Sequence, residues 1–172
     1  MKTNAFIAAR PQLHIPGIID SRVDEVHITL AYLKDVEIDA VHEAMNTDLY
    51  RGWPTSPILS NVHGSAQWLN NDGAFVSVLL VQPVAKTISR HSIYDERARI
   101  ESSLLKNKIK LDDTYPFVPH ITKKFSDTPL RPPTVEAPVM FAIDTLYLSH
   151  QVSDGEGGTR WSNEALMASP SY

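Results

Sequence analysis

The chain has 172 residues, no cysteine and a formal net charge of −4. A chain of this length can form one domain with a sizeable core. Its 42% apolar and 21% charged residues are typical of a globular protein rather than a disordered one. The composition excludes disulfides, thiolate nucleophiles and cysteine-based zinc sites, and the negative charge disfavours a long nucleic-acid duplex as ligand. We expect a single domain over residues 1–172 that binds a small nucleotide-like ligand or a chain end.

No segment of the sequence predicts an association with a membrane. The apolar stretch near the N-terminus, residues 6–9, is too short for a signal peptide. No apolar run approaches the roughly 20 residues that a membrane span needs. The lack of cysteine also fits a reducing compartment, so we expect a cytoplasmic protein.

The first half of the chain predicts two strands and a helix. A short strand is expected over residues 6–9, and the prolines and glycine of 11–17 leave no room for a long helix after it. A second strand is expected over 25–33. Apolar residues then recur at helical spacing from Ile38 onward, so a helix is predicted that ends at 52–54.

The sequence from residue 58 onward predicts two hairpins separated by a helix. The helix is expected over 92–108, with Ser92 and Asp95 as a capping box. Residues 70–73, Asn-Asn-Asp-Gly, have the composition of a hairpin turn. The hairpin strands are expected at 58–69 with 74–81, and at 139–151 with 159–167. This mixed order predicts an α+β domain, with helices outside an antiparallel sheet and the site on its concave side.

The tripeptide His-Ile-Thr occurs twice, at 27–29 and at 120–122, each time inside an apolar run. Residues i and i+2 of a strand share a face. His27 would therefore stand beside Thr29, and His120 beside Thr122. If the two strands are neighbours, two imidazoles and two hydroxyls converge on one concave patch, which suits a phosphodiester.

The same alternation predicts which other side chains of the motif strands are buried. Tyr32 would lie on the apolar face of the first strand, in the core. Ile121 and Phe125 would lie together on the face opposite His120.

Phosphodiester cleavage needs a base, an acid and donors to the phosphoryl oxygens. Histidine can transfer protons in either direction near neutrality, because its ordinary pKa is about 6.5. Two such groups beside one phosphorus would titrate as a coupled pair, the threonines would donate to phosphate, and no metal would be needed. The residues alone leave a second interpretation open, in which these are half-buried sheet histidines bonded to neighbouring threonines.

The segments Val26–Leu30 and Pro119–Thr122 resemble the paired His-x-Thr/Ser signature of the 2H phosphoesterase superfamily. That superfamily includes LigT-like RNA ligases, 2',3'-cyclic nucleotide phosphodiesterases, and viral and phage enzymes that hydrolyse oligonucleotide messengers. The approach Tyr115–Pro119 and the final hairpin Ile143–Met167 also resemble the family. The resemblance covers nearly the whole chain in order, although only the motifs are specific.

The resemblance implies a bilobal α+β fold with pseudo-twofold symmetry and a cofactor-free, metal-independent active site in a concave cleft. It implies that His27 and His120 are the acid/base pair and that Thr29 and Thr122 bind phosphate. The chain departs from the family before the first motif, where 11–24 cannot hold the usual long helix.

Several aromatic residues are secondary candidates for a nucleobase site. Tyr115 is a candidate for stacking on a base, whereas Phe117 is predicted to pack in the core. Trp53, Trp68 and Trp161 would either line a nucleobase pocket or serve as packing residues. No histidine has metal-ligand spacing such as His-Glu-x-x-His, so a zinc site is not predicted.

The sequence thus favours a metal-independent phosphodiesterase. Its substrate would be a 2',3'-cyclic phosphate in RNA processing, or a cyclic or 2',5'-linked signalling oligonucleotide. The partner would be a small nucleotide, an oligonucleotide or an RNA end, and no obligate protein partner is indicated. The alternatives are a non-catalytic nucleotide-binding module of the same fold, and a structural domain with fortuitous motifs. The two histidines argue against the module, because binding alone does not require two proton-transfer groups.

Overall fold

The structure is a computed structural model that describes residues 2–48 and 57–168. In chain order its elements are β1 (Lys2–Gln12), β2 (His14–Ile15), β3 (Ile19–Asp20), β4 (Ile28–Glu37), α1 (Ile38–Asp48), β5 (Ile58–Leu69), β6 (Phe75–Pro83), α2 (Ile93–Lys106), β7 (His120–Ser126), β8 (Val139–Ser153) and β9 (Thr159–Ala168). The predicted α+β class is confirmed. Neither described helix is long and apolar enough to cross a membrane.

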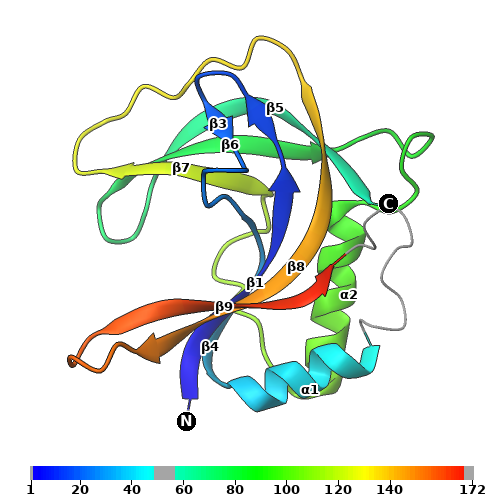
Figure 1. Ribbon diagram of the computed structural model, residues 1–172, viewed down its shortest axis with the longest axis vertical. Helices are drawn as coiled ribbons and strands as arrows, with labels where there is room; N and C mark the ends of the chain where they lie inside the picture. Colours follow the sequence, from blue (N-terminus) through cyan, green and yellow to red (C-terminus); the bar gives the residue numbers. More distant parts are fainter. Residues whose placement is uncertain (1, 49–56, 169–172) are drawn as a thin grey trace.

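Seven strands form one antiparallel sheet in the order β4-β1-β8-β5-β6-β7, with β9 also paired to β8. The two lobes are halves of this sheet, because β8 is long enough to pair with strands of both lobes. Residues 139–143 of β8 pair with β5, residues 142–150 with β1, and residues 145–153 with β9. In Figure 1, β8 runs from the half that holds β5, β6 and β7 to the half that holds β1, β4 and β9.

The segment between β1 and the first motif contains no helix, which agrees with the prediction that its prolines leave no room for a long one. Instead, β2 and β3 pair as a small separate hairpin. Gly17 lies in the turn of this hairpin with a φ of +72°, a conformation that costs glycine little.

The β5–β6 hairpin was predictable because its turn is specified locally. Strand β5 spans the predicted residues 58–69. The Asn70 Oδ1 accepts hydrogen bonds from the backbone N–H groups of Asp72 (3.1 Å) and Ala74 (2.8 Å). Gly73 adopts a φ of +82°, which completes a turn that reverses the chain.

Both helices lie beside the sheet (Figure 1) and pack against it with their buried apolar residues. Helix α2 begins at the predicted capping box, with Ser92 as N-cap and Asp95 as its partner. It contacts α1 through the Ser103 hydroxyl, which donates to the carbonyl of Ala44 at 2.8 Å. Helix α1 begins at Ile38 as predicted, whereas the predicted stop at 52–54 lies outside the described residues.

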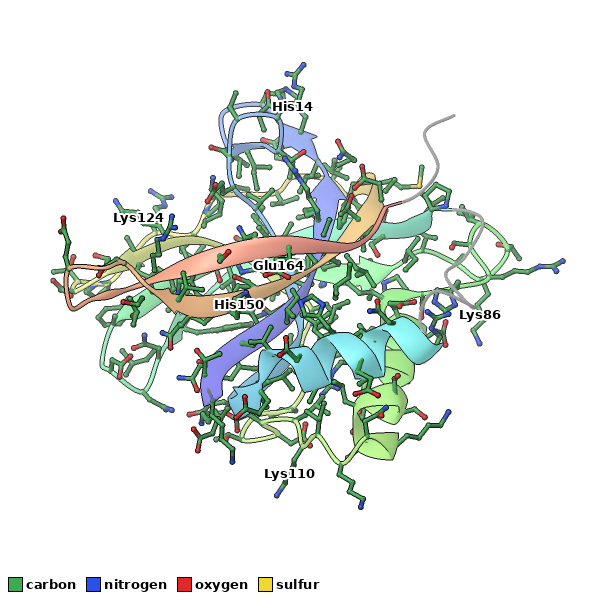
Figure 2. The ribbon with its side chains drawn as sticks, turned by 60° about the horizontal axis from the view of Figure 1, so that its bottom comes forward. His14, Lys86, Lys110, Lys124, His150 and Glu164 are labelled. Atoms are coloured by element: carbon green, nitrogen blue, oxygen red, sulfur yellow. The ribbon has the colours of Figure 1, made fainter. Side chains whose placement is uncertain are left out.

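The carboxylate of Glu164 in β9 connects α1 to the sheet through two histidines. The Nε2 of His42 in α1 lies 2.7 Å from Glu164 Oε2, and the Nε2 of His150 in β8 lies 2.9 Å from Glu164 Oε1. Figure 2 shows His150 and Glu164 side by side above α1. The hydrogen bond from His150, followed by that from His42, holds the pKa of Glu164 below its ordinary value.

Each motif strand carries a β-bulge three residues after its histidine. Consecutive residues of β1 pair with Ala31 and Thr29, so Leu30 has no register partner on β1. In the same way, consecutive residues of β6 pair with Lys124 and Thr122, so Lys123 has no register partner on β6. A bulge inserts one extra residue and so shifts the alternation of faces beyond it. The same local distortion in both motif strands supports the pseudo-twofold relation between the lobes.

These bulges make two predictions of side-chain burial wrong. Tyr32 was expected in the core, but it lies on the same cavity face as Thr29. Phe125 was expected on the same face as Ile121, but Phe125 is 62% exposed whereas Ile121 is fully buried. Strict alternation fails for Tyr32 and Phe125, because each is separated from its motif by the extra residue of a bulge.

Candidate active site

The two motif strands lie at opposite ends of the strand order, yet they contact each other. They meet because the sheet curves, not because they pair. Strand β4 begins at Ile28, three residues later than the expected start at 25, so His27 directly precedes it. His120 is the first residue of β7. Repulsion from His120 contributes to lowering the pKa of His27, so the two imidazoles are close enough to interact.

His27 is half-buried among aromatic rings. Its imidazole stacks on Phe6 with 5.2 Å between ring centroids and 20° between planes. Tyr147 lies edge-on to it at 6.3 Å. Burial is the main cause that lowers the pKa of His27, repulsion from His120 is the second, and Glu25 opposes both. The surroundings therefore favour the neutral imidazole.

His120 is half-buried in the other lobe, with its ring oriented by two contacts. The ring of Trp68 meets it edge-on at 4.5 Å. Its Nδ1 lies 2.8 Å from the carbonyl of Val118, and since a carbonyl only accepts, Nδ1 carries the proton. In the neutral ring, Nε2 is then the available acceptor. Burial lowers the pKa of His120, partly opposed by the Val118 hydrogen bond.

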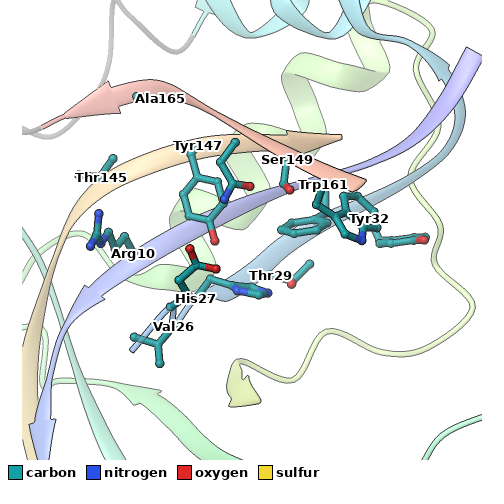
Figure 3. A pocket seen from close by; sticks show the side chains of 13 residues that line it. Arg10, Val26, His27, Thr29, Tyr32, Thr145, Tyr147, Ser149, Trp161 and Ala165 are labelled. Atoms are coloured by element: carbon teal, nitrogen blue, oxygen red, sulfur yellow. The ribbon is translucent and has the colours of Figure 1, made fainter. Parts of the chain in front are cut away.

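A cavity of about 610 Å³ opens beside His27, within the range of small-molecule sites. Its walls come from one face of β1, β4, β8 and β9 and from the residues that lead into β4. Figure 3 shows His27, Thr29, Tyr147, Ser149 and Trp161 around it. The lining residues are Phe6, Arg10, Glu25, Val26, His27, Thr29, Tyr32, Thr145, Tyr147, Ser149, Trp161, Asn163 and Ala165.

The cavity contains His27 and Thr29 of the predicted site, but not His120 or Thr122. Thr122 follows His120 in β7 and is half-buried. The second motif therefore approaches from the opposite lobe, through the contact between β4 and β7.

Most other lining residues could not be found from the motifs. In β8, Thr145, Tyr147 and Ser149 line the cavity, and they alternate with the fully buried Leu146 and Leu148. This polar–apolar alternation is the signal that a two-faced strand leaves in a sequence. It does not reveal that β1, β4 and β9 complete the same wall, because that depends on strand pairing.

Two features of the cavity are electrostatically distinctive. Burial, then the Glu25 carboxylate, raises the pKa of the Tyr147 hydroxyl, whereas Arg10 lowers it. The phenol is therefore neutral, and its pKa is affected by one negative and one positive side chain. The Ser149 side chain is fully buried, and its hydroxyl has no hydrogen-bond partner among the described residues.

The secondary aromatic candidates have different locations. Tyr115 is 63% exposed, and its hydroxyl donates to the Asn71 side chain rather than lining the cavity. Phe117 packs against the core, as predicted. Trp161 lines the cavity and Trp68 contacts His120, whereas Trp53 lies outside the described residues. Over 2–48 and 57–168, no group of three or more His, Asp or Glu side chains is arranged to hold a metal ion.

Similar folds occur among solved structures. E. coli LigT complexed with ATP is 17% identical, with a TM-score of 0.61 over 97% of this chain and 99% of that chain. E. coli LigT complexed with 3'-AMP is 20% identical, with a TM-score of 0.58 over 96% and 98%. The protein TT0787 of Thermus thermophilus is 17% identical, with a TM-score of 0.59 over 96% and 98%. No family model and no curated protein matches the sequence.

These matches span nearly all of the chain and of each matched structure. The resemblance that the two motifs predict is therefore confirmed at the level of the fold. The chain has the fold of the LigT-type 2H phosphoesterases.

Proposed function

We propose that the chain is a metal-independent phosphodiesterase that hydrolyses a nucleotide phosphodiester by two-histidine acid/base catalysis. The substrate is a 2',3'-cyclic phosphate or a cyclic or 2',5'-linked oligonucleotide. The observation that carries this proposal is the contact between the two motif strands, β4 and β7, one from each lobe, with a nucleotide-sized cavity beside His27. A cytoplasmic location stays a prediction from the sequence.

The proposed reaction needs the two imidazoles in opposite protonation states. The neutral imidazole takes a proton from water as the water oxygen bonds to phosphorus. The charged imidazole gives its proton to the leaving oxygen as the bond from phosphorus to that oxygen breaks. Repulsion between the rings supports this arrangement, because it disfavours the state in which both are charged.

The remaining predicted residues fit roles around the same phosphate. Thr29 and Thr122, each two residues after a histidine, donate to the non-bridging oxygens that gain charge. The hydrogen bond of His120 to Val118 fixes the ring so that its Nε2, not its Nδ1, is free to act on substrate. E. coli LigT has been crystallised with ATP, 3'-AMP, NADP+ and phosphate, which supports a nucleotide as the ligand of this fold.

The test is turnover of 2',3'-cyclic nucleotides and 2',5'-linked dinucleotides by the full chain in excess chelator. His27→Ala and His120→Ala should each lower the rate by about 10²–10⁴-fold if the imidazoles transfer protons. His63→Ala is the matched control, because His63 is exposed and begins a third His-x-Thr/Ser pattern, His63-Gly64-Ser65. This control should keep full activity.

Three results separate the competing functions. Turnover that depends on both motif histidines supports the proposal. Nucleotide binding without turnover would instead identify a non-catalytic module, and neither binding nor turnover would leave a structural domain. Turnover that chelator abolishes, or that survives both alanine variants, would contradict two-histidine catalysis.

A further inference from the structure

The cavity beside His27 has polar groups that proton transfer and phosphate binding do not use. Arg10, Glu25, Ser149 and Asn163 all line it. The two histidines and two threonines already supply an acid, a base and donors to phosphate. These four additional groups are therefore available to a different part of a ligand.

Ser149 is the first sign of a ligand in this cavity. Its side chain is fully buried, and its hydroxyl has no partner among the described residues. Native structures rarely leave a buried hydroxyl unsatisfied. Asn163 is the register partner of Ser149 across β8 and β9, and it lines the same cavity. The two side chains form a polar pair on one cavity wall.

The charges of Arg10 and Glu25 are the second indication that the cavity binds a ligand. They carry opposite charges and line the same cavity, and both act on the Tyr147 hydroxyl. No ion pair joins them in the part of the chain that the structure describes. Each charge therefore remains available to a ligand instead of being neutralised by the other.

The cavity walls that face these groups are aromatic. Phe6 and Trp161 lie with 4.9 Å between ring centroids, and Tyr147 lies at 6.5 Å from Phe6. Figure 3 shows Tyr147 and Trp161 on the walls, with Arg10 at one side. Aromatic side chains bind nucleobases by stacking, because every base has a π-face. The cavity thus combines stacking surfaces with one acceptor-only and one donor-only side chain.

We propose that this cavity is a guanine subsite for the nucleotide whose phosphate lies between the two histidines, an inference that rests on the proposed function. Guanine offers two adjacent donors, N1–H and the N2 amino group, to the Glu25 carboxylate. It offers two adjacent acceptors, O6 and N7, to the Arg10 guanidinium, a bidentate pairing that other bases lack. Adenine would place an amino group where Arg10 needs an acceptor.

The test compares kcat/KM for 2',3'-cyclic GMP and 2',3'-cyclic AMP in wild type, Glu25→Gln and Arg10→Met. Wild type should favour guanine, and each substitution should lower the guanine-to-adenine ratio by roughly 5- to 150-fold, the range of one good bidentate contact. The ratio removes any effect that Glu25 has on His27, because such an effect is common to both substrates.

Two matched controls accompany these variants. Glu136→Gln removes the same charge from an exposed position outside the cavity and should leave the ratio unchanged. Ser149→Ala should raise KM several-fold. Ser60→Ala should not raise KM, because Ser60 does not line the cavity, although its hydroxyl is also buried and has no hydrogen-bond partner among the described residues.

The outcomes separate this inference from the proposed function. Turnover without guanine preference, or an equal loss for both bases in Glu25→Gln and Arg10→Met, would overturn the guanine subsite and leave the phosphodiesterase standing. If no cyclic nucleotide is hydrolysed, binding of 3'-GMP and 3'-AMP is measured by quenching of tryptophan fluorescence. A guanine preference that Glu25→Gln abolishes then supports the subsite, and equal or absent binding overturns it.

Discussion

Phe6→Ala tests how the cavity wall controls His27. The Phe6 ring contacts three others, with centroids at 5.2 Å from His27, 4.9 Å from Trp161 and 6.5 Å from Tyr147. At about 0.5 kcal/mol each, the low end for aromatic pairs, these contacts contribute ~1.5 kcal/mol. Loss of the half-buried ring's apolar area adds about 1 kcal/mol. We expect the free energy of unfolding to fall by about 2–3 kcal/mol, and Tm by about 5–10 °C.

The same substitution should raise the pKa of His27. Burial is the main cause that lowers this pKa, and removing Phe6 admits water to one face of the imidazole. Because the folded pKa lies below the unfolded one, wild type loses stability as pH falls from about 6.5 toward the folded pKa. Phe6→Ala should lose less stability over that range, since its folded pKa is closer to the unfolded value.

Urea denaturation measures the change in stability, and NMR titration of the imidazole C–H signals measures the pKa. Phe117→Ala is the control, because Phe117 is half-buried with an aromatic and a cation–π contact away from His27. It should cost stability without moving the His27 titration. If the pKa of His27 is unchanged in Phe6→Ala, burial by the Phe6 ring is not what lowers it.

Three other predictions concern pH and local structure. The pH profile of kcat/KM should be bell-shaped with its optimum below about pH 6.5, since the pKa values of both His27 and His120 are lowered; an optimum above neutrality would contradict this. Glu164→Gln should cost about 1–2 kcal/mol, because two hydrogen bonds weaken at a carboxylate that is 43% exposed. It should also remove stability that wild type has above about pH 4.5 and loses as pH falls through the lowered pKa of Glu164, as acid denaturation of both proteins would show. Ser92→Ala should cost about 1 kcal/mol of unfolding free energy through loss of the α2 cap, and a cost near zero in urea denaturation would mean that tertiary packing alone starts this helix.

Elements whose chemistry is local were predictable from the sequence. The capping box at Ser92 and the turn that ends at Gly73 each specify a boundary with a few neighbouring side chains. The paired His-Ile-Thr motifs could also be recognised, because each lies at the start of a strand with a clear apolar pattern. The placement of His27 beside Thr29 on one face followed from alternation alone.

Features that depend on pairing were not predictable in the same way. The bulges at Leu30 and Lys123 arise where one strand is aligned with its neighbour, and no residue type marks them. They moved Tyr32 into the cavity and left Phe125 exposed. Most of the cavity's lining was missed because its walls come from four strands. Residues as distant as Phe6 and Trp161 meet only because β1 and β9 both pair with β8.

The most direct test of the account is a crystal structure of the protein with a bound nucleoside 2'-monophosphate. We expect one phosphate held between the lobes, with the Nε2 atoms of His27 and His120 each about 2.7–3.2 Å from its oxygens. A phosphate that contacts only one of these imidazoles, or that binds away from both, would contradict it.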